Sequence, residues 1–204
     1  MKTNDFDSIA FLYDWLKRIV FWGNIDRATN EYLGQIQSYS NILIVGGGTG
    51  KLLNYLPDSC KVTYVEKSEK MLLQAYKYAK ARQIKFVNLD FLEFSSEEEF
   101  DALICPFFLD VFGETNLNKV IQKFSSMMHS KSLFLVSDFQ PVSHTAGRGL
   151  IKIMLWFFDI TTKLEARKLL SIHQFLHKHG FSTLAIKAFH FKMIFAAIYQ
   201  REEM

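Results

Sequence analysis

A short apolar run that opens into glycines constrains the fold of this chain more than any other stretch. The residues from Ile42 to Val45 are all apolar, which is typical of a strand buried on both faces of a parallel sheet. Leu52, Leu53 and Leu56 then predict a helix whose free amides would point at a bound ligand. The turn between them is rich in glycine, which allows close approach of the backbone to a ligand. Its glycines are Gly46, Gly47, Gly48 and Gly50.

Three nucleotide-binding folds use such a turn, and the glycine spacing separates them. In a phosphate-binding P-loop, Val45 would occupy the first glycine position and Leu52 the hydroxyl position, so that motif is absent. A dinucleotide fingerprint requires glycine where Lys51 stands. The remaining pattern, Gly46-x-Gly48-x-Gly50, resembles motif I of the class I S-adenosylmethionine-dependent methyltransferases. This resemblance implies S-adenosylmethionine as the cofactor and S-adenosylhomocysteine as the product.

The order of apolar segments predicts an α/β fold. Apolar strands alternate with helical patterns from residue 42 to residue 137, which indicates a doubly wound, mostly parallel sheet. The class I resemblance covers most of the chain and implies a Rossmann-like, seven-stranded sheet with an antiparallel last strand. We expect one domain over residues 1–204, with N-terminal cap helices in 1–35 and an apolar lid or substrate segment in 141–172.

Composition and charge narrow the function classes. The chain has 204 residues, of which 49% are hydrophobic and 22% charged, and this suits one well-buried globular domain. The formal net charge is only +3 and the lysines and arginines are scattered, so we expect no nucleic-acid partner. Cys60 and Cys105 lack metal-ligand or redox-pair spacing, which indicates reduced thiols. Since the N-terminus also has no apolar signal core, we expect a cytoplasmic protein.

The N-terminal segment carries a second resemblance. Phe6-Asp7-x-Ile9-Ala10-x-x-Tyr13-Asp14 is similar to the opening helix of the ubiquinone and menaquinone C-methyltransferase group. In those relatives this helix caps the cofactor. The resemblance therefore implies that Tyr13 lies near the methyl donor, as a candidate for both cofactor binding and catalysis. The alternative is that Tyr13 packs the helix against the sheet.

Two acidic residues after the second and third strands are candidates for cofactor binding. Glu66 lies twenty positions after Gly46, and an acid at this distance can accept hydrogen bonds from the ribose hydroxyls. Asp90 stands where class I methyltransferases often place a residue that binds the adenine amine, and Phe91 would contact the adenine ring. The alternative for Phe91 is a place in the hydrophobic core.

The fourth strand ends without the polar group that many amine methyltransferases carry. Those relatives have Asn or Asp followed by Pro-Pro-Tyr, whereas this chain has Cys105-Pro106-Phe107-Phe108. The resemblance places Pro106 beside the cofactor, and the phenylalanines favour an apolar acceptor or a nucleophilic oxygen or carbon. They also replace the carboxylate pair that aminopropyl transferases need here. Asp110 would orient a substrate hydroxyl, or else cap a helix that starts at Val111.

The segment after the fifth strand is the expected acceptor side. Leu150 to Phe158 is almost entirely apolar but shorter than the roughly 20 residues of a membrane-spanning helix. It suits a buried helix, an apolar lid, or an edge that contacts a membrane surface. His144, in the preceding loop, is the candidate general base. His173 and His177 would share a helix face, but no third ligand is evident, so we predict no metal site.

These features predict methyl transfer to a small hydrophobic acceptor, such as a phenol, a quinone or a lipid-like molecule. One position departs from the family pattern. Ile44 stands where the family usually has an acid, which helps to hold the methionine portion of the cofactor. Ile44 and the missing polar group after the fourth strand support an alternative, in which the chain is a catalytically silent binding module that acts with a partner. The oligomeric state is left open.

Overall fold

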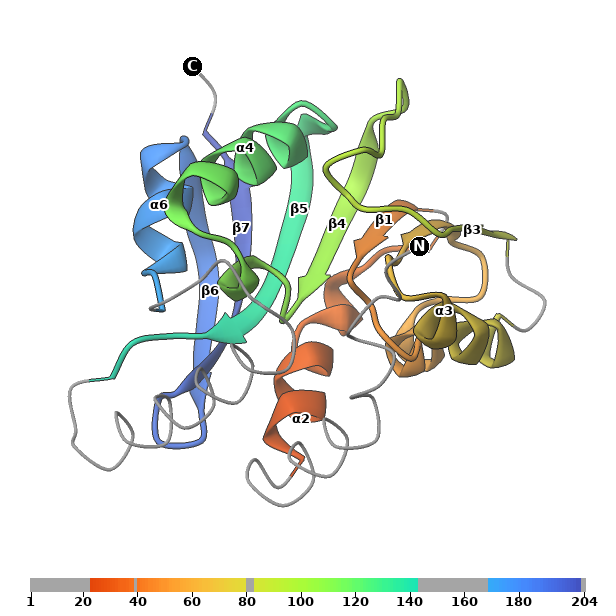
Figure 1. Cartoon of the computed structure of the whole chain (residues 1–204), viewed down its shortest axis with the longest axis horizontal. Coiled ribbons are helices and arrows are strands. Elements are labelled where there is room, and N and C mark those ends of the chain that lie inside the picture. The colour runs from red at the N-terminus through yellow and green to blue at the C-terminus, as the bar shows by residue number, and fades with distance from the viewer. Residues whose placement is uncertain (1–22, 39, 80–82, 143–168, 203–204) are drawn as a thin grey trace, which may run out of the picture.

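The computed structural model describes residues 23–38, 40–79, 83–142 and 169–202. These residues form a seven-stranded sheet in the order β3-β2-β1-β4-β5-β7-β6 (Figure 1). β1 to β5 are parallel, and β7 runs antiparallel to both of its neighbours. The predicted doubly wound sheet with an antiparallel last strand is therefore confirmed. The strands are β1 (Asn41–Val45), β2 (Lys61–Val65), β3 (Gln83–Val87), β4 (Phe100–Pro106), β5 (Met128–Phe139), β6 (Phe181–Phe189) and β7 (Ile194–Arg201).

Helices cover both faces of this sheet. One face is covered by α4 and α6, and the other by α2, α3 and the short 3-10 helices η1 and η2. In the described part of the chain, no helix is both long enough and apolar enough to cross a membrane. The helices are α2 (Asn24–Asn30), η1 (Leu33–Gln35), η2 (Lys51–Tyr55), α3 (Glu69–Ala75), η3 (Tyr76–Tyr78), η4 (Leu109–Val111), α4 (Glu114–Ser125) and α6 (Ile172–Lys178).

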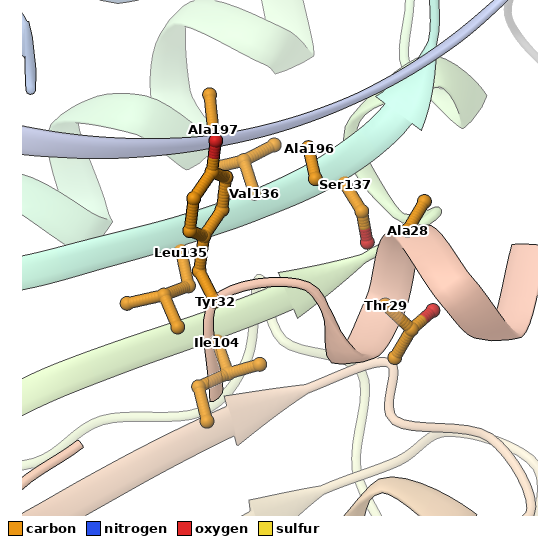
Figure 2. Close-up of a pocket in the computed structure, with 9 residues that line it drawn as sticks. All are labelled: Ala28, Thr29, Tyr32, Ile104, Leu135, Val136, Ser137, Ala196 and Ala197. Atoms are coloured by element: carbon orange, nitrogen blue, oxygen red, sulfur yellow. The ribbon is translucent and has the colours of Figure 1, made fainter. Parts of the chain in front are cut away.

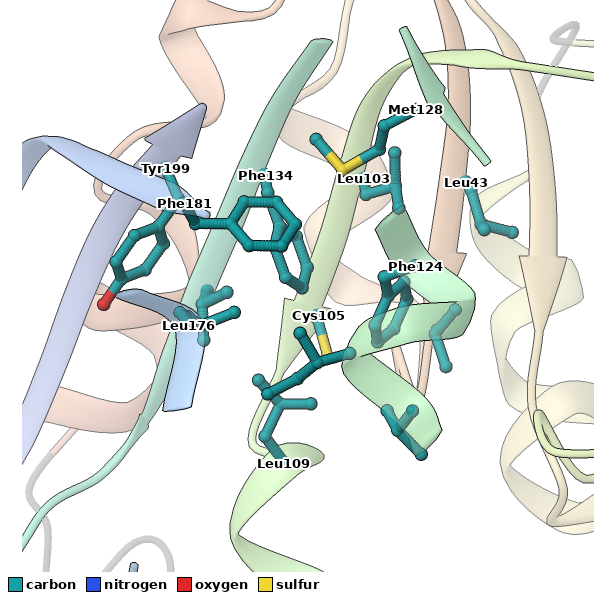
Figure 3. Packing of buried hydrophobic residues seen from close by; sticks show 14 of the residues in the cluster. Leu43, Leu103, Cys105, Leu109, Phe124, Met128, Phe134, Leu176, Phe181 and Tyr199 are labelled. Carbon is teal, nitrogen blue, oxygen red and sulfur yellow. The ribbon is translucent and has the colours of Figure 1, made fainter. Parts of the chain in front are cut away.

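The central strand β1 is buried on both faces, as its apolar run predicts. Leu43 and Val45 join the core beneath α4 and α6, while Ile42 and Ile44 join the core on the opposite face. All four side chains are at most 1% exposed. Figure 3 shows the first of these cores, where side chains from α4 and α6 meet those of the central strands. Because both faces of β1 are filled, we expect a ligand of the glycine loop at the edge where the strands end.

The helix predicted after the glycines forms, but as a short 3-10 helix. Leu52 and Leu53 are buried, but they belong to the five-residue 3-10 helix η2, which ends at Tyr55. Pro57 explains this early end, because the residue before a proline is disfavoured in the helical conformation. Leu56 is indeed extended, with φ −90° and ψ 149°. The glycine loop itself must therefore supply most of the backbone amides that face a ligand.

The helix after the fourth strand also starts later than predicted. Asp110 lies inside η4, and α4 begins only at Glu114, after the extended Gly113. The prediction that Asp110 caps a helix starting at Val111 is therefore wrong. Its backbone amide instead donates a hydrogen bond of 3.2 Å to Asp138 Oδ2, at the end of β5.

Candidate cofactor and acceptor site

The glycine loop lies at the carboxyl end of β1, and three of its glycines have left-handed backbone. The φ angles are +66° at Gly46, +60° at Gly48 and +78° at Gly50, a region that residues with a Cβ rarely adopt. Space is also restricted. A Cβ atom at Gly46 would lie 2.8 Å from Phe108 Cδ2, and one at Gly50 would lie 2.6 Å from the Cβ of Ala75. The spacing seen in the sequence thus reflects both backbone conformation and packing.

Gly47, the variable position of the motif, is required for a different reason. Its φ is ordinary, but a Cβ there would lie 2.6 Å from Tyr64 Cζ and 2.8 Å from Ile44 Cγ2. The Tyr64 hydroxyl lies against this glycine and donates a hydrogen bond of 3.0 Å to the Gly48 carbonyl oxygen. Tyr64 was not predicted as a site residue, because only the strand register places it beside Ile44.

Glu66 directly follows β2 and is 8% exposed. Its Oε2 accepts a hydrogen bond from the Gly48 amide at 3.0 Å, and its Oε1 accepts one from the Ser68 amide at 2.9 Å. Burial raises the pKa of Glu66, although these amides counteract part of that rise. A carboxylate oxygen has a second lone pair, so each oxygen has capacity for a ribose hydroxyl. The structure thus brings Glu66 and the glycine loop together.

Asp90 lies at the neighbouring strand end, after β3. Its carboxylate accepts a hydrogen bond of 2.8 Å from Lys67 Nζ and one of 2.9 Å from the Leu92 amide. Partial burial alone would raise the pKa of Asp90, but these bonds and the lysine charge lower it below its usual value. Asn88 ties the same loop to β2, because its Nδ2 donates to the Glu66 carbonyl at 2.9 Å. The loop that carries the predicted adenine ligand Asp90 is therefore held in place by several hydrogen bonds.

Phe91 has a different place from the one suggested by the family resemblance. Its side chain is 2% exposed and belongs to the core under α4. The ring stacks on Phe124 with 4.4 Å between centroids. The Phe91 ring therefore has little exposed surface with which to contact adenine. The structure places Phe91 in the core, which was the alternative interpretation of the sequence.

Aromatic side chains gather where β4 ends, beside the glycine loop. Pro106 is buried and pairs with Ser137 of β5. Phe107 follows with a left-handed φ of +51°, and its ring meets Phe139 edge-on at 5.1 Å between centroids. Phe108 packs next to Gly46. The half-buried phenylalanines form the apolar wall that the sequence predicted at this edge.

Behind this wall lies a pair of carboxyl groups that the sequence analysis did not bring together. Asp138, at the end of β5, is fully buried and accepts hydrogen bonds from the amides of Leu109 (2.9 Å), Asp110 (3.2 Å) and Phe139 (2.8 Å). Burial raises the pKa of Asp110 from 3.8 to about 6, and that of Asp138 well above its usual range. Two carboxyls this close and this buried do not readily both ionise. The pair therefore holds a proton at an edge that the sequence indicated to be apolar.

The remaining predicted positions lie elsewhere. Tyr13, His144 and most of the predicted lid at 141–172 fall outside the described residues. His173 Nδ1 forms a hydrogen bond with the Tyr199 hydroxyl, and His177 Nε2 forms one of 3.1 Å with Thr183 Oγ1. Within the described ranges, no cluster of three or more His, Cys, Asp or Glu side chains is arranged to hold a metal.

A narrow pocket opens on the α2 face of the sheet, between α2 and strands β4, β5 and β7 (Figure 2). Most of its side chains are small, which explains why the helix and the sheet leave space there. The lining residues are Ala28, Thr29, Tyr32, Ile104, Leu135, Val136, Ser137, Ala196 and Ala197. Ser137 connects this pocket to the β4 end, since it pairs with Pro106.

Comparison with known proteins agrees with this geometry. Residues 42–131 match the family model described as a methyltransferase domain. Among solved structures, mitomycin 7-O-methyltransferase (TM-score 0.65, 16% identity) aligns over 87% of this chain and 54% of its own. Magnesium protoporphyrin IX methyltransferase from Synechocystis PCC 6803, solved with S-adenosylhomocysteine, aligns over 88% of this chain and 82% of its own (TM-score 0.66, 19% identity).

A third structure covers the whole chain. It is a chain from a complex of the Haloferax volcanii Trm112 methyltransferase activator, with a TM-score of 0.75, 10% identity and 100% coverage of both chains. No curated protein matches the sequence.

Residues 42–131 thus match a methyltransferase domain, and the chain shares its fold with solved methyltransferases. One of these structures holds S-adenosylhomocysteine, the product of the cofactor that the glycine spacing predicted. The narrower resemblance to the ubiquinone and menaquinone C-methyltransferase group stays a prediction, because it depends on residues outside the described ranges.

Proposed function

We propose that this enzyme transfers a methyl group from S-adenosylmethionine to a small, hydrophobic acceptor, such as a phenol, a quinone or a lipid-like molecule. One observation carries the proposal. The glycine loop with Glu66 and the apolar wall of Phe107 and Phe108 lie at the same edge of the sheet, in contact through Gly46 and Phe108. A polar cofactor surface thus adjoins an apolar surface, which suits an apolar molecule placed beside the methyl donor.

We assign the cofactor-binding roles as follows. The loop from Gly46 to Gly50 would face the methionine portion with its amides, and Glu66 would accept hydrogen bonds from the ribose. Asp90 would accept one from the adenine amine. When bound, the cofactor supplies a methyl group on a positively charged sulfur, which is already a good leaving group. The chain's main contribution is to hold the acceptor in line with that methyl group.

The carboxyl pair adds a way to remove a proton from the acceptor. The bond from sulfur to methyl breaks as the bond from the acceptor's nucleophile to methyl forms, and the electron pair stays on sulfur. If the nucleophile is a hydroxyl, its proton must leave as well. Asp110 is partly exposed at the apolar wall, and its pKa of about 6 suits a base near neutral pH. We propose Asp110 as this base, with Asp138 positioning it.

A specific surface favours a second candidate function, in which the chain acts with a partner. Tyr55, Leu73 and Tyr76 are 59%, 58% and 50% exposed, and η2 and η3, which carry the two tyrosines, lie in contact. This apolar surface is on the β3 side of the sheet, near the cofactor loop. The full-length structural match comes from a complex with a methyltransferase activator. Contact with a membrane surface would be another use of exposed apolar residues.

A transfer assay separates these proposals. Purified chain is incubated with S-adenosylmethionine labelled on its methyl group and with two sets of acceptors, apolar phenols and quinones in one and polar amines in the other. We expect label in the apolar set only. Transfer to the amines alone would refute the apolar acceptor, and cofactor binding without transfer to either set would favour the partner-dependent function.

The compartment is also a proposal. Cys60 and Cys105 are both buried thiols, as is common for proteins in a reducing environment. We therefore keep the cytoplasm as the proposed location.

A further inference from the structure

We propose that the Tyr64 hydroxyl positions the glycine loop for the cofactor, at the place where the motif lacks its usual acid. The inference rests on the proposed function, since it concerns how the cofactor site is held. Ile44, which replaces the acid, is fully buried and pairs with Tyr64 in the register of β1 and β2. The sequence left open whether a chain with isoleucine here retains an ordered cofactor loop. The neighbouring strand provides the missing polar group.

The hydroxyl reaches the loop because the glycine between them has no side chain. Tyr64 is 0% exposed, and its ring is fixed in the core against Phe86, with 5.5 Å between centroids. Only the hydroxyl end leaves the core, and it lies where a Cβ of Gly47 would otherwise stand. The Tyr64 ring thus places its hydroxyl within hydrogen-bond distance of the Gly48 carbonyl oxygen.

Gly48 is held from both sides as a result. Its carbonyl oxygen accepts the hydrogen bond from the Tyr64 hydroxyl at 3.0 Å, and its amide donates to Glu66 Oε2 at 3.0 Å. Glu66 is the predicted ribose ligand, so the bond from Tyr64 fixes the same peptide that orients this carboxylate. Loss of the hydroxyl should therefore disturb the cofactor site through the loop.

The phenol keeps its proton in this environment. Burial raises the pKa of Tyr64 well above 10, and the negative charge of Glu66 raises it further. The hydroxyl is therefore a hydrogen-bond donor at all ordinary pH values. A carbonyl at the end of an αL glycine needs such a donor, because an unpaired buried carbonyl is unfavourable.

The test compares two buried tyrosines by isothermal titration with S-adenosylhomocysteine. Tyr64→Phe removes only the hydroxyl and keeps the ring. Tyr199→Phe is the matched control, because Tyr199 is also 0% exposed and its hydroxyl binds His173, on the far side of the sheet core. We expect affinity to fall about tenfold in Tyr64→Phe, the size of one buried hydrogen bond, and to stay within about twofold in Tyr199→Phe.

If the hydroxyl had a purely structural role, its removal would lower the stability of the protein without a selective loss of cofactor affinity in Tyr64→Phe. Thermal unfolding is therefore measured on both variants, and amide hydrogen exchange is followed in the peptide that contains Gly46 to Leu53. Faster exchange of that peptide in Tyr64→Phe alone supports the inference. Unchanged affinity in Tyr64→Phe, or an equal loss in both variants, would overturn it.

Gly47→Ala tests the same contact while the hydroxyl is retained. The added Cβ would displace the phenol from Gly48, so a loss of about the same size is expected. Wild-type affinity in Gly47→Ala would contradict the inference even if Tyr64→Phe did not fold. Failure of the proposed function is distinguishable, since wild-type protein would then bind no S-adenosylhomocysteine at all.

Discussion

Replacing Asp110 by asparagine should change how the stability of this protein depends on pH. Asp110 is half-buried next to the fully buried Asp138, and its backbone amide donates a hydrogen bond of 3.2 Å to Asp138 Oδ2. Asparagine has the shape of a protonated aspartic acid and can donate a hydrogen bond, but it never becomes charged. The variant therefore mimics the low-pH state of the pair at every pH.

The size of the effect follows from the pKa of Asp110, which burial raises from 3.8 to about 6. A raised folded-state pKa means that the folded protein binds the proton more tightly than the unfolded chain does. This contribution to stability is fully present below about pH 4 and is lost as the pH rises through about 6. A shift of about 2 units corresponds to about 3 kcal/mol. Relative to wild type, Asp110→Asn should gain about this much between about pH 4 and pH 7.5.

Urea unfolding at a series of pH values measures this difference. Glu97→Gln is the control, because Glu97 is an exposed carboxylate, and its effect should stay within about 0.5 kcal/mol at every pH. Asp138→Asn provides a contrast. An amide can accept on only one side, whereas Asp138 accepts from three backbone amides on its two oxygens, so this variant should lose about 1 to 3 kcal/mol at neutral pH.

The reasoning would be refuted by one result above all. If the difference in unfolding free energy between wild type and Asp110→Asn were the same at about pH 4 and about pH 7.5, Asp110 would have an ordinary pKa in the folded protein. Asp110 would then lose its support as a base.

Two further substitutions test the loop and the frame of the sheet. Gly50→Ala should lower the unfolding free energy by about 2 to 4 kcal/mol, because φ is +78° and the new Cβ would meet Ala75; a loss below about 0.5 kcal/mol in urea unfolding would contradict the geometry. Ser132→Ala should lose about 1 to 3 kcal/mol, since the buried hydroxyl donates to the Phe100 carbonyl at 2.6 Å and accepts from the His129 amide at 3.0 Å. It lies at the amino end of β5, so cofactor affinity should not change, and a titration that showed weaker binding would count against this placement of the site.

The sheet was predictable from the sequence because its central strands are buried on both faces. The apolar run at Ile42 to Val45 lies in β1, and the next apolar segment, from Lys61 to Val65, forms β2. Helix lengths were less predictable. Leu52, Leu53 and Leu56 predicted a helix, but the residues form a five-residue 3-10 helix that ends before Pro57.

Candidate residues that follow from spacing along the chain were easier to identify than residues whose importance depends on contacts between distant segments. Glu66 follows from its distance to the glycines, and the structure brings it to the loop. Tyr64 and Asp138 depend on contacts between segments far apart in sequence, which spacing does not reveal. In the sequence, Tyr64 is an ordinary strand residue. Only the strand register shows that it pairs with Ile44. Asp138 becomes a candidate site residue only because the end of β5 contacts the loop after β4.

The family resemblance predicted one site residue less well than it predicted the fold. Phe91 occupies the expected position in the chain, but its ring turns into the core and stacks on Phe124. Position along a loop does not determine which way a side chain points, particularly where many aromatic residues compete for the same core. The chain has 20 phenylalanines, so a core place for any one of them was a strong alternative.

The most direct test of the account is calorimetric titration of the wild-type protein with S-adenosylmethionine and S-adenosylhomocysteine, beside Glu66→Gln. The substitution removes a charged acceptor and leaves the shape of the side chain nearly unchanged. We predict roughly micromolar binding by the wild type and a loss of at least about tenfold in Glu66→Gln. A wild-type protein that is folded by circular dichroism and binds neither compound would contradict the cofactor site, and equal binding by wild type and variant would contradict the role of Glu66.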